Sequence, residues 1–264
     1  MSARHGVATL AALAAGVVCS VSAEALNLQR LDPAEETLRV AILATLDPVI
    51  APKKQNGTAV LLTWKELYAP LTPEQRLFLD ACRALRADAL GATSHYFGET
   101  AAADLEPVGT QSILKDGAGK PLDPQYLPRP ALESYQRMMT AMQADLGKRL
   151  LVESGYRSPA YQLYLFLFYM SNHDLSIIDT NRHVALPGHS EHGAPSHQAI
   201  DFINEAGING EDHPEEFEAL PEYAWLQAHA NAYGFVLSYP RGNAMNTAFE
   251  PWHWHYEAEK DAHR

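Results

Sequence analysis

Cysteine is nearly absent from this chain of 264 residues, which has only Cys19 and Cys82. A framework of several disulfides is therefore excluded, and the fold must rest on a hydrophobic core. Positive charge is also scarce, because 20 Lys and Arg stand against 32 Asp and Glu and give a formal net charge of −12. An acidic chain binds polyanions poorly, so we expect neither nucleic acid nor an anionic membrane surface as a partner.

Long apolar runs are missing as well. No stretch beyond the N-terminus approaches about 18 unbroken apolar residues, so we expect no membrane span. Residues 1–23 begin with positive charge, continue with a short apolar run and end with VSA, a small-residue cleavage motif. This is the layout of a signal peptide cleaved after Ala23. Cys19 raises the alternative of a lipoprotein, although Val18 stands where a small residue should precede a lipidated cysteine. We expect an exported protein, either periplasmic or secreted.

The mature sequence divides at a segment rich in Gly, Pro and Asp. Residues 31–100 are mostly helical in pattern, and one helix is expected to begin after Thr72, with Gln75 at the capping-box position. Residues 101–130 indicate a linker or a long surface loop. We therefore predict three parts: a signal peptide (1–23), a mostly helical N-terminal region of unknown role (24–125) and a second domain (126–264).

Helices and strands follow one another irregularly in the second domain. A helix ended by Gly147 is expected to precede the strand KRLLVES, and YQLYLFLFYMSN predicts a buried aromatic helix. QAIDFIN and WHWHY alternate like strands, and the second places His253 and His255 on one face. Because regular β-α-β alternation is lacking, we predict an α+β fold with a small antiparallel sheet flanked by helices.

Histidine is concentrated in two segments of this domain. GHSEHGAPSHQAID (188–201) has three histidines and an aspartate, and EPWHWHY (250–256) has two histidines after a glutamate. Imidazole nitrogens and carboxylate oxygens are zinc ligands, and three protein ligands with an open position are typical of catalytic zinc. The alternative is that these are scattered surface histidines and a packed aromatic strand.

Spacing bears on which histidine of the first segment could share a metal with Asp201. If His197 and Asp201 lie on one extended strand, their Cα atoms are about 13 Å apart, too far for side chains to share one ion without a bend. His192 precedes GAPS, which can turn the chain back toward the strand. We therefore expect His192 to pair with Asp201, and His197 to be the spare histidine.

Four segments in a fixed order, SGYRSPAYQ, PGHSEH…AID, YGFVLSYP and EPWHWHY, resemble the VanY-type zinc D-alanyl-D-alanine carboxypeptidases of the lysostaphin and hedgehog group. The resemblance covers roughly residues 126–258 and says nothing about residues 24–125. It implies that residues 126–264 form a hedgehog/DD-peptidase-like zinc peptidase domain with Zn²⁺ as cofactor and peptidoglycan stem peptides as partners. The reaction it implies is removal of the C-terminal D-amino acid by zinc-bound water. An L,D-carboxypeptidase, a peptidoglycan endopeptidase and a non-catalytic zinc-stabilised module that binds cell wall remain alternatives.

The resemblance also assigns roles to individual residues. It implies that the zinc ligands are His192, Asp201 and His253, and that Glu250 is the catalytic base. It also implies that Arg157 is catalytic and contacts the carbonyl or carboxylate of the substrate. Ser190 and Gln162 match positions that hold the end of the substrate. His255 shares a face with His253 and is expected to contact substrate or to support the site. One departure from the family pattern is the spacing, since eight residues rather than the usual six separate His192 from Asp201. A two-residue insertion explains it most simply and keeps His197 as the alternative ligand.

Overall fold

The computed structural model describes residues 26–101, 103–115, 117–243 and 248–257, so the predicted signal peptide lies outside the described residues. The α-helices in this part of the chain are α1 Pro33–Gln55, α2 Trp64–Tyr68, α3 Pro73–Arg83, α4 Arg129–Leu146, α5 Pro159–Tyr169, α6 Ile177–His183, α7 Pro214–Glu218 and α8 Pro221–His229. The strands are β1 Leu105–Pro107, β2 Ser112–Lys115, β3 Ala118–Pro121, β4 Tyr126–Pro128, β5 Leu150–Ser154, β6 His197–Asn204, β7 Phe235–Leu237 and β8 His253–Glu257. Short 3-10 turns lie at η1 Ala59–Leu61, η2 Asp88–Leu90, η3 Met170–His173, η4 Glu191–Gly193 and η5 Ala230–Tyr233. None of the described helices is long and apolar enough to cross a membrane.

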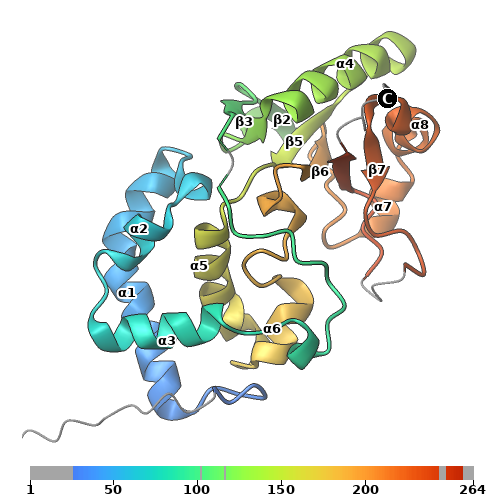
Figure 1. Cartoon of the computed structure of the whole chain (residues 1–264). Helices are drawn as coiled ribbons and strands as arrows, with labels where there is room; N and C mark the ends of the chain where they lie inside the picture. Colours follow the sequence, from blue (N-terminus) through green and yellow to red (C-terminus); the bar gives the residue numbers. More distant parts are fainter. Residues whose placement is uncertain (1–25, 102, 116, 244–247, 258–264) are drawn as a thin grey trace, which may run out of the picture.

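A four-stranded antiparallel sheet of order β5-β6-β8-β7 forms the centre of the second half of the chain (Figure 1). Strand alternation places Ile200, Phe202 and Trp254 on one face, where they join a core with side chains of α4 and α8. Asp201 and His253 then occupy the opposite face. The predicted α+β fold with a small antiparallel sheet flanked by helices is confirmed, and the sheet separates a packed core from a polar face.

Several helix ends follow directly from the sequence. The Thr72 hydroxyl accepts the backbone N–H of Gln75, and the Gln75 side chain accepts the N–H of Thr72, so the expected capping box is present. Gly147 ends α4 in the left-handed conformation, with φ of 66°. The helix after Thr72 ends at Arg83.

The prediction of a linker or long loop over residues 101–130 was wrong. β1 pairs with β4 and β2 pairs with β3, each as a short antiparallel ladder. The strands have three or four residues each, and most of these residues are exposed or half-buried. Such short strands show no alternation of apolar and polar residues, so the pattern of the segment does not identify them as strands.

The helices of the N-terminal region pack directly on α5 and α6 (Figure 1). One core includes Ile42, Leu46 and Leu79 from this region together with Phe166 and Leu167 from α5. The described helices of this region lie between residues 33 and 90, within the stretch 31–100 whose pattern is helical, and the short strands β1 to β3 follow them. The division at 125/126 stays a prediction about domains, but the hydrophobic core of α5 is shared across it.

Candidate metal centre

The three predicted metal ligands meet on the polar face of the sheet. His192 Nε2 lies 3.0 Å from Asp201 Oδ2, and His253 Nδ1 lies 2.8 Å from Asp201 Oδ1. One ligand atom from each residue lies within 4.8 Å of the other two. The structure therefore brings together two imidazoles and a carboxylate, a donor set that zinc accepts.

Strand register and one tight turn bring these residues together. Asp201 on β6 is the direct partner of His253 on β8, and side chains at such positions point to the same face. His192 comes from η4, just before the chain turns into β6, and its carbonyl accepts the backbone N–H of Arg157 at 3.0 Å. The return of the chain after His192 that the GAPS segment predicts is thus present.

Hydrogen bonds fix which nitrogen of each histidine faces the aspartate. His192 Nδ1 lies 2.8 Å from the backbone carbonyl of Gly155, which can only accept, so Nδ1 carries the proton and Nε2 keeps its lone pair. His253 Nε2 lies 3.0 Å from Glu191 Oε2, so its Nδ1 is the nitrogen left to face Asp201. A metal-ligating histidine generally donates its other N–H to such an acceptor, and both histidines meet this condition.

The charges of the group also suit a cation. Burial opposes ionisation of Asp201, but His192 and His253 outweigh it and hold the pKa of the carboxyl well below its usual range. Asp201 Oδ1 is buried without a hydrogen-bond partner among the described residues, although His253 Nδ1 is close. A buried carboxylate oxygen that faces two imidazole nitrogens is available to a cation. The residues present therefore fit a zinc ion.

Glu250 lies beside this group. Its Oε2 is 3.7 Å from His253 Nδ1, and its carbonyl accepts the backbone N–H of His253 at 3.2 Å across the turn at Pro251. Burial raises the pKa of Glu250 to about 7. The turn takes Glu250 out of strand alternation and brings its carboxyl close to the predicted ligands.

A second group of side chains, which we call the Glu191 cluster, lies on the Nε2 side of His253, away from Asp201. It consists of Glu191, His197, Ser238 and His255. Glu191 Oε1 is 3.2 Å from His197 Nε2, and the rings of His197 and His255 stack at 3.7 Å. His197, the alternative ligand, thus lies apart from the group formed by His192. Sequence reasoning missed Glu191 and Ser238, and the available signal was the position of Glu191 next to His192.

The four residues predicted to bind substrate have the following surroundings. Arg157 begins the turn into α5, and its Nε is buried without a hydrogen-bond partner in the described part of the chain. Gln162 donates from Nε2 to the carbonyl of Ala185 at 2.7 Å, and its Oε1 is likewise unpartnered there. Ser190 is the N-cap residue of η4 and is buried. His255 belongs to the Glu191 cluster. The substrate roles of these four residues stay predictions.

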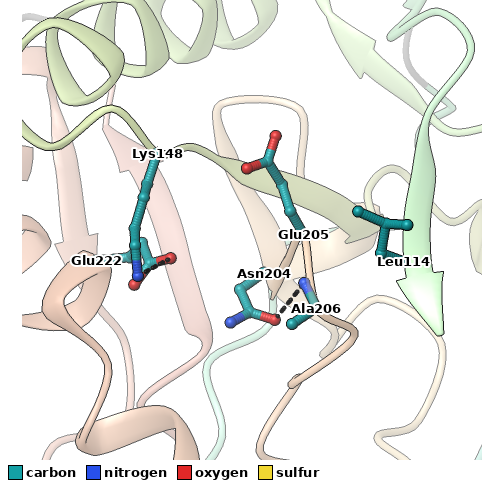
Figure 2. Close-up of a pocket in the computed structure, with 6 residues that line it drawn as sticks. All are labelled: Leu114, Lys148, Asn204, Glu205, Ala206 and Glu222. Atoms are coloured by element: carbon teal, nitrogen blue, oxygen red, sulfur yellow. Dashed lines mark hydrogen bonds and ion pairs between the residues drawn. The ribbon is translucent and has the colours of Figure 1, made fainter. Parts of the chain in front are cut away.

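A separate pocket of about 230 Å³ lies at the far end of β6 (Figure 2). Its walls include the ion pair of Lys148 with Glu222 and the turn in which Asn204 accepts the N–H of Ala206. None of the predicted site residues lines it. The candidate site is therefore defined by the converging ligand atoms and not by this pocket.

Comparison with known families decides the identity of the fold. A family model for VanY, described as D-alanyl-D-alanine carboxypeptidase, matches residues 124–259, which is more than half of the chain. The chain belongs to the VanY family. The four-segment resemblance is thereby confirmed, and the VanY match contains the four described strands of the main sheet, His192, Asp201, His253 and Glu250.

Relatives of this VanY chain include a candidate carboxypeptidase of Bacillus subtilis (strain 168), YodJ, which is 30% identical over 143 residues. That alignment covers 52% of the chain and 49% of YodJ, so the chain spans about half the length of this curated relative.

Two solved structures illustrate the range of similarity. The LdcB LD-carboxypeptidase is 27% identical, with a TM-score of 0.48 and coverage of 61% of this chain and 71% of that one. VanYB in complex with D-alanine-D-alanine is 23% identical, with a TM-score of 0.40 and coverage of 51% and 73%. Because both TM-scores are below 0.5, the assignment rests on the family match.

Proposed function

We propose that this protein is a zinc-dependent carboxypeptidase that removes the C-terminal D-amino acid from peptidoglycan stem peptides. The observation that carries the proposal is the convergence of His192 Nε2, Asp201 and His253 Nδ1, with the Glu250 carboxyl next to them. Membership of the VanY family supports the substrate class. A zinc ion held by these three residues would act as a Lewis acid and lower the pKa of a water molecule toward 7.

Glu250 is the base in this proposal. Its carboxylate accepts the proton of the attacking water and then gives that proton to the leaving amine. Glu250 is half-buried and close to His253, so it can reach a water molecule beside the ligands without joining the predicted donor set. A module that only binds cell wall has no need of a carboxylate at this place, and we therefore favour an enzyme.

Arg157 is proposed to contact the scissile carbonyl or the terminal carboxylate of the peptide. A guanidinium presents a planar set of donors that matches a carboxylate, and the buried Nε of Arg157 has no partner among the described residues. The unpartnered Oε1 of Gln162 could accept a substrate N–H in the same way. Ser190, beside His192, and His255 complete the proposed contacts with the peptide end.

Digestion of purified muropeptides tests the activity. We expect the purified protein to shorten stem pentapeptides by one alanine residue, as seen by mass spectrometry, and the Glu250→Gln variant to do so far more slowly. A product only from tetrapeptides would make the protein an L,D-carboxypeptidase, and cleavage of cross-linked dimers would make it an endopeptidase. No product from any of these substrates in the presence of zinc would contradict the proposal.

Export to the periplasm or the medium is part of the same proposal, because peptidoglycan lies outside the cytoplasm. It is supported by the signal-peptide pattern of residues 1–23. Mass spectrometry of the protein from culture fractions should find a mature chain that begins at Glu24. Retention of residues 1–23 in a cytoplasmic fraction would contradict it, and a lipid on Cys19 would show lipoprotein processing instead.

A further inference from the structure

The carboxylate of Glu191 is buried and accepts hydrogen bonds from three side chains. Ser238 Oγ donates to Oε2 at 2.6 Å, His253 Nε2 lies 3.0 Å from the same oxygen, and His197 Nε2 lies 3.2 Å from Oε1. Only 6% of Glu191 is exposed, so water contributes little to these contacts. A carboxylate has no proton to donate, and therefore both imidazole nitrogens that face it carry protons.

Each polar atom of this cluster can be assigned as a hydrogen-bond donor or acceptor, so the cluster forms a continuous hydrogen-bond network. Because Ser238 gives its only proton to Glu191, its oxygen must accept from His255 Nδ1 at 2.8 Å. The histidine nitrogens that point into the cluster are thus N–H groups and have no free lone pairs. One ligand atom each of Glu191, His197 and His255 lies within 4.8 Å of the other two, but the nitrogens that face Glu191 and Ser238 are already used as hydrogen-bond donors. These features disfavour a second cation between Glu191, His197 and His255.

We propose that Glu191 is a positioning residue that holds the ring of His253 with its Nδ1 turned toward the zinc site. The inference rests on the proposed function, since it assumes that His253 binds zinc. By accepting a hydrogen bond from Nε2–H, Glu191 disfavours the other tautomer of His253 and fixes the plane of its ring. The negative charge of Glu191 also makes the lone pair of Nδ1 a stronger metal ligand. His197 and Ser238 hold the carboxylate in turn.

Glu191 differs in kind from the acceptor that orients the other histidine. His192 is held by a backbone carbonyl, that of Gly155, whereas His253 is held by an ionised side chain. Glu191 is also the chain neighbour of His192 within η4. One short turn therefore supplies one ligand and orients another that lies on β8, so a change at Glu191 should affect the metal site without removing any ligand.

Metal affinity of the full-length protein tests this inference. We expect Glu191→Gln, which keeps the size of the side chain but removes its charge, to weaken zinc binding roughly 10- to 100-fold in competition with a chelator. Cobalt(II) should also give an altered absorption spectrum in this variant, because the ring of His253 is no longer held in place. The matched control is Glu257→Gln, which removes an exposed carboxylate 3.5 Å from His255 Nε2. It should bind zinc like the wild type.

The outcomes separate this inference from the proposed function. If the wild type binds no zinc, the proposed function fails. If the wild type binds zinc and Glu191→Gln matches it in affinity and in the cobalt spectrum, the positioning role is wrong. Two zinc ions per wild-type chain and one in the variant would also overturn it, because Glu191 would then be a ligand. Should Glu191→Gln not fold, Ser238→Ala removes one donor to the carboxylate and should weaken zinc binding in the same direction by a smaller factor, and wild-type affinity there would contradict the role.

Discussion

His192 and His197 lie five positions apart, yet they have different surroundings. His192 is buried in η4, with one nitrogen facing Asp201 and the other held by Gly155. His197 is the first residue of β6, and its Nε2 faces Glu191. The turn before β6 brings His192 to Asp201 across the eight residues between them, and His197 faces Glu191 instead. The two-residue insertion stays a prediction.

The first prediction follows from this difference. His192→Ala should lose the zinc ion because a ligand nitrogen is removed, whereas His197→Ala should keep about one zinc per chain because its nitrogen is a hydrogen-bond donor. Metal content measured by mass spectrometry on both purified variants checks this. Zinc retained in His192→Ala but lost in His197→Ala would show that the alternative ligand is the correct one.

At the scale of elements, the predictions that succeeded had strong local signals. The alternation of WHWHY identified β8 and the shared face of His253 and His255, both of which are buried. Thr72 and Gly147 identified helix ends through capping chemistry. The pairing of Glu191 with His253 had no such signal, because it joins residues 62 positions apart in the chain. Long-range partners of this kind depend on strand register, which the sequence of one segment does not specify.

Gly155 offers a prediction at this scale, because the turn after β5 packs closely on β4. A Cβ at this position would lie 2.6 Å from the carbonyl oxygen of Tyr126. Gly155→Ala should therefore destabilise the fold by about 1–3 kcal/mol. Since the carbonyl of Gly155 orients His192, zinc affinity should fall too. Thermal unfolding and chelator competition measure the two effects.

The control for this variant is Gly119→Ala, where an added Cβ meets nothing within 4 Å. A change at such an open surface position is expected to alter stability by no more than about 0.5 kcal/mol. If Gly155→Ala were as stable as Gly119→Ala and bound zinc like the wild type, the turn after β5 would have no part in orienting His192.

At the scale of the whole molecule, the helical region before the VanY match shares a hydrophobic core with α5 and α6. Arg39 Nη1 donates to the carbonyl of Leu167 at 2.9 Å, and Ser158 Oγ donates to the carbonyl of Leu62 at 2.6 Å. These bonds join α1 and the turn before α2 to the two ends of α5. The sequence showed a helical region but not its contacts, because amphipathic helices do not specify their partners.

The third prediction concerns this shared core. A chain truncated to residues 124–264 should be aggregated or much less stable than the full protein, because the apolar side of α5 would be exposed to water. Size-exclusion chromatography and thermal unfolding of the two proteins check this. A monomeric truncated chain with an unchanged melting temperature would show that the two parts fold independently.

The central claim is that a zinc ion and Glu250 act together on a peptide bond. The most direct measurement is zinc titration of the metal-free wild type and of Glu250→Gln, with release of the C-terminal residue of a stem pentapeptide as the readout. The wild type should gain activity up to about one zinc per chain. Glu250→Gln should bind the same amount, keep its melting temperature and turn over roughly 10²–10⁴-fold more slowly, because its ligands remain and only the base is lost. Full activity without zinc, or a variant within about tenfold of the wild type, would contradict the account.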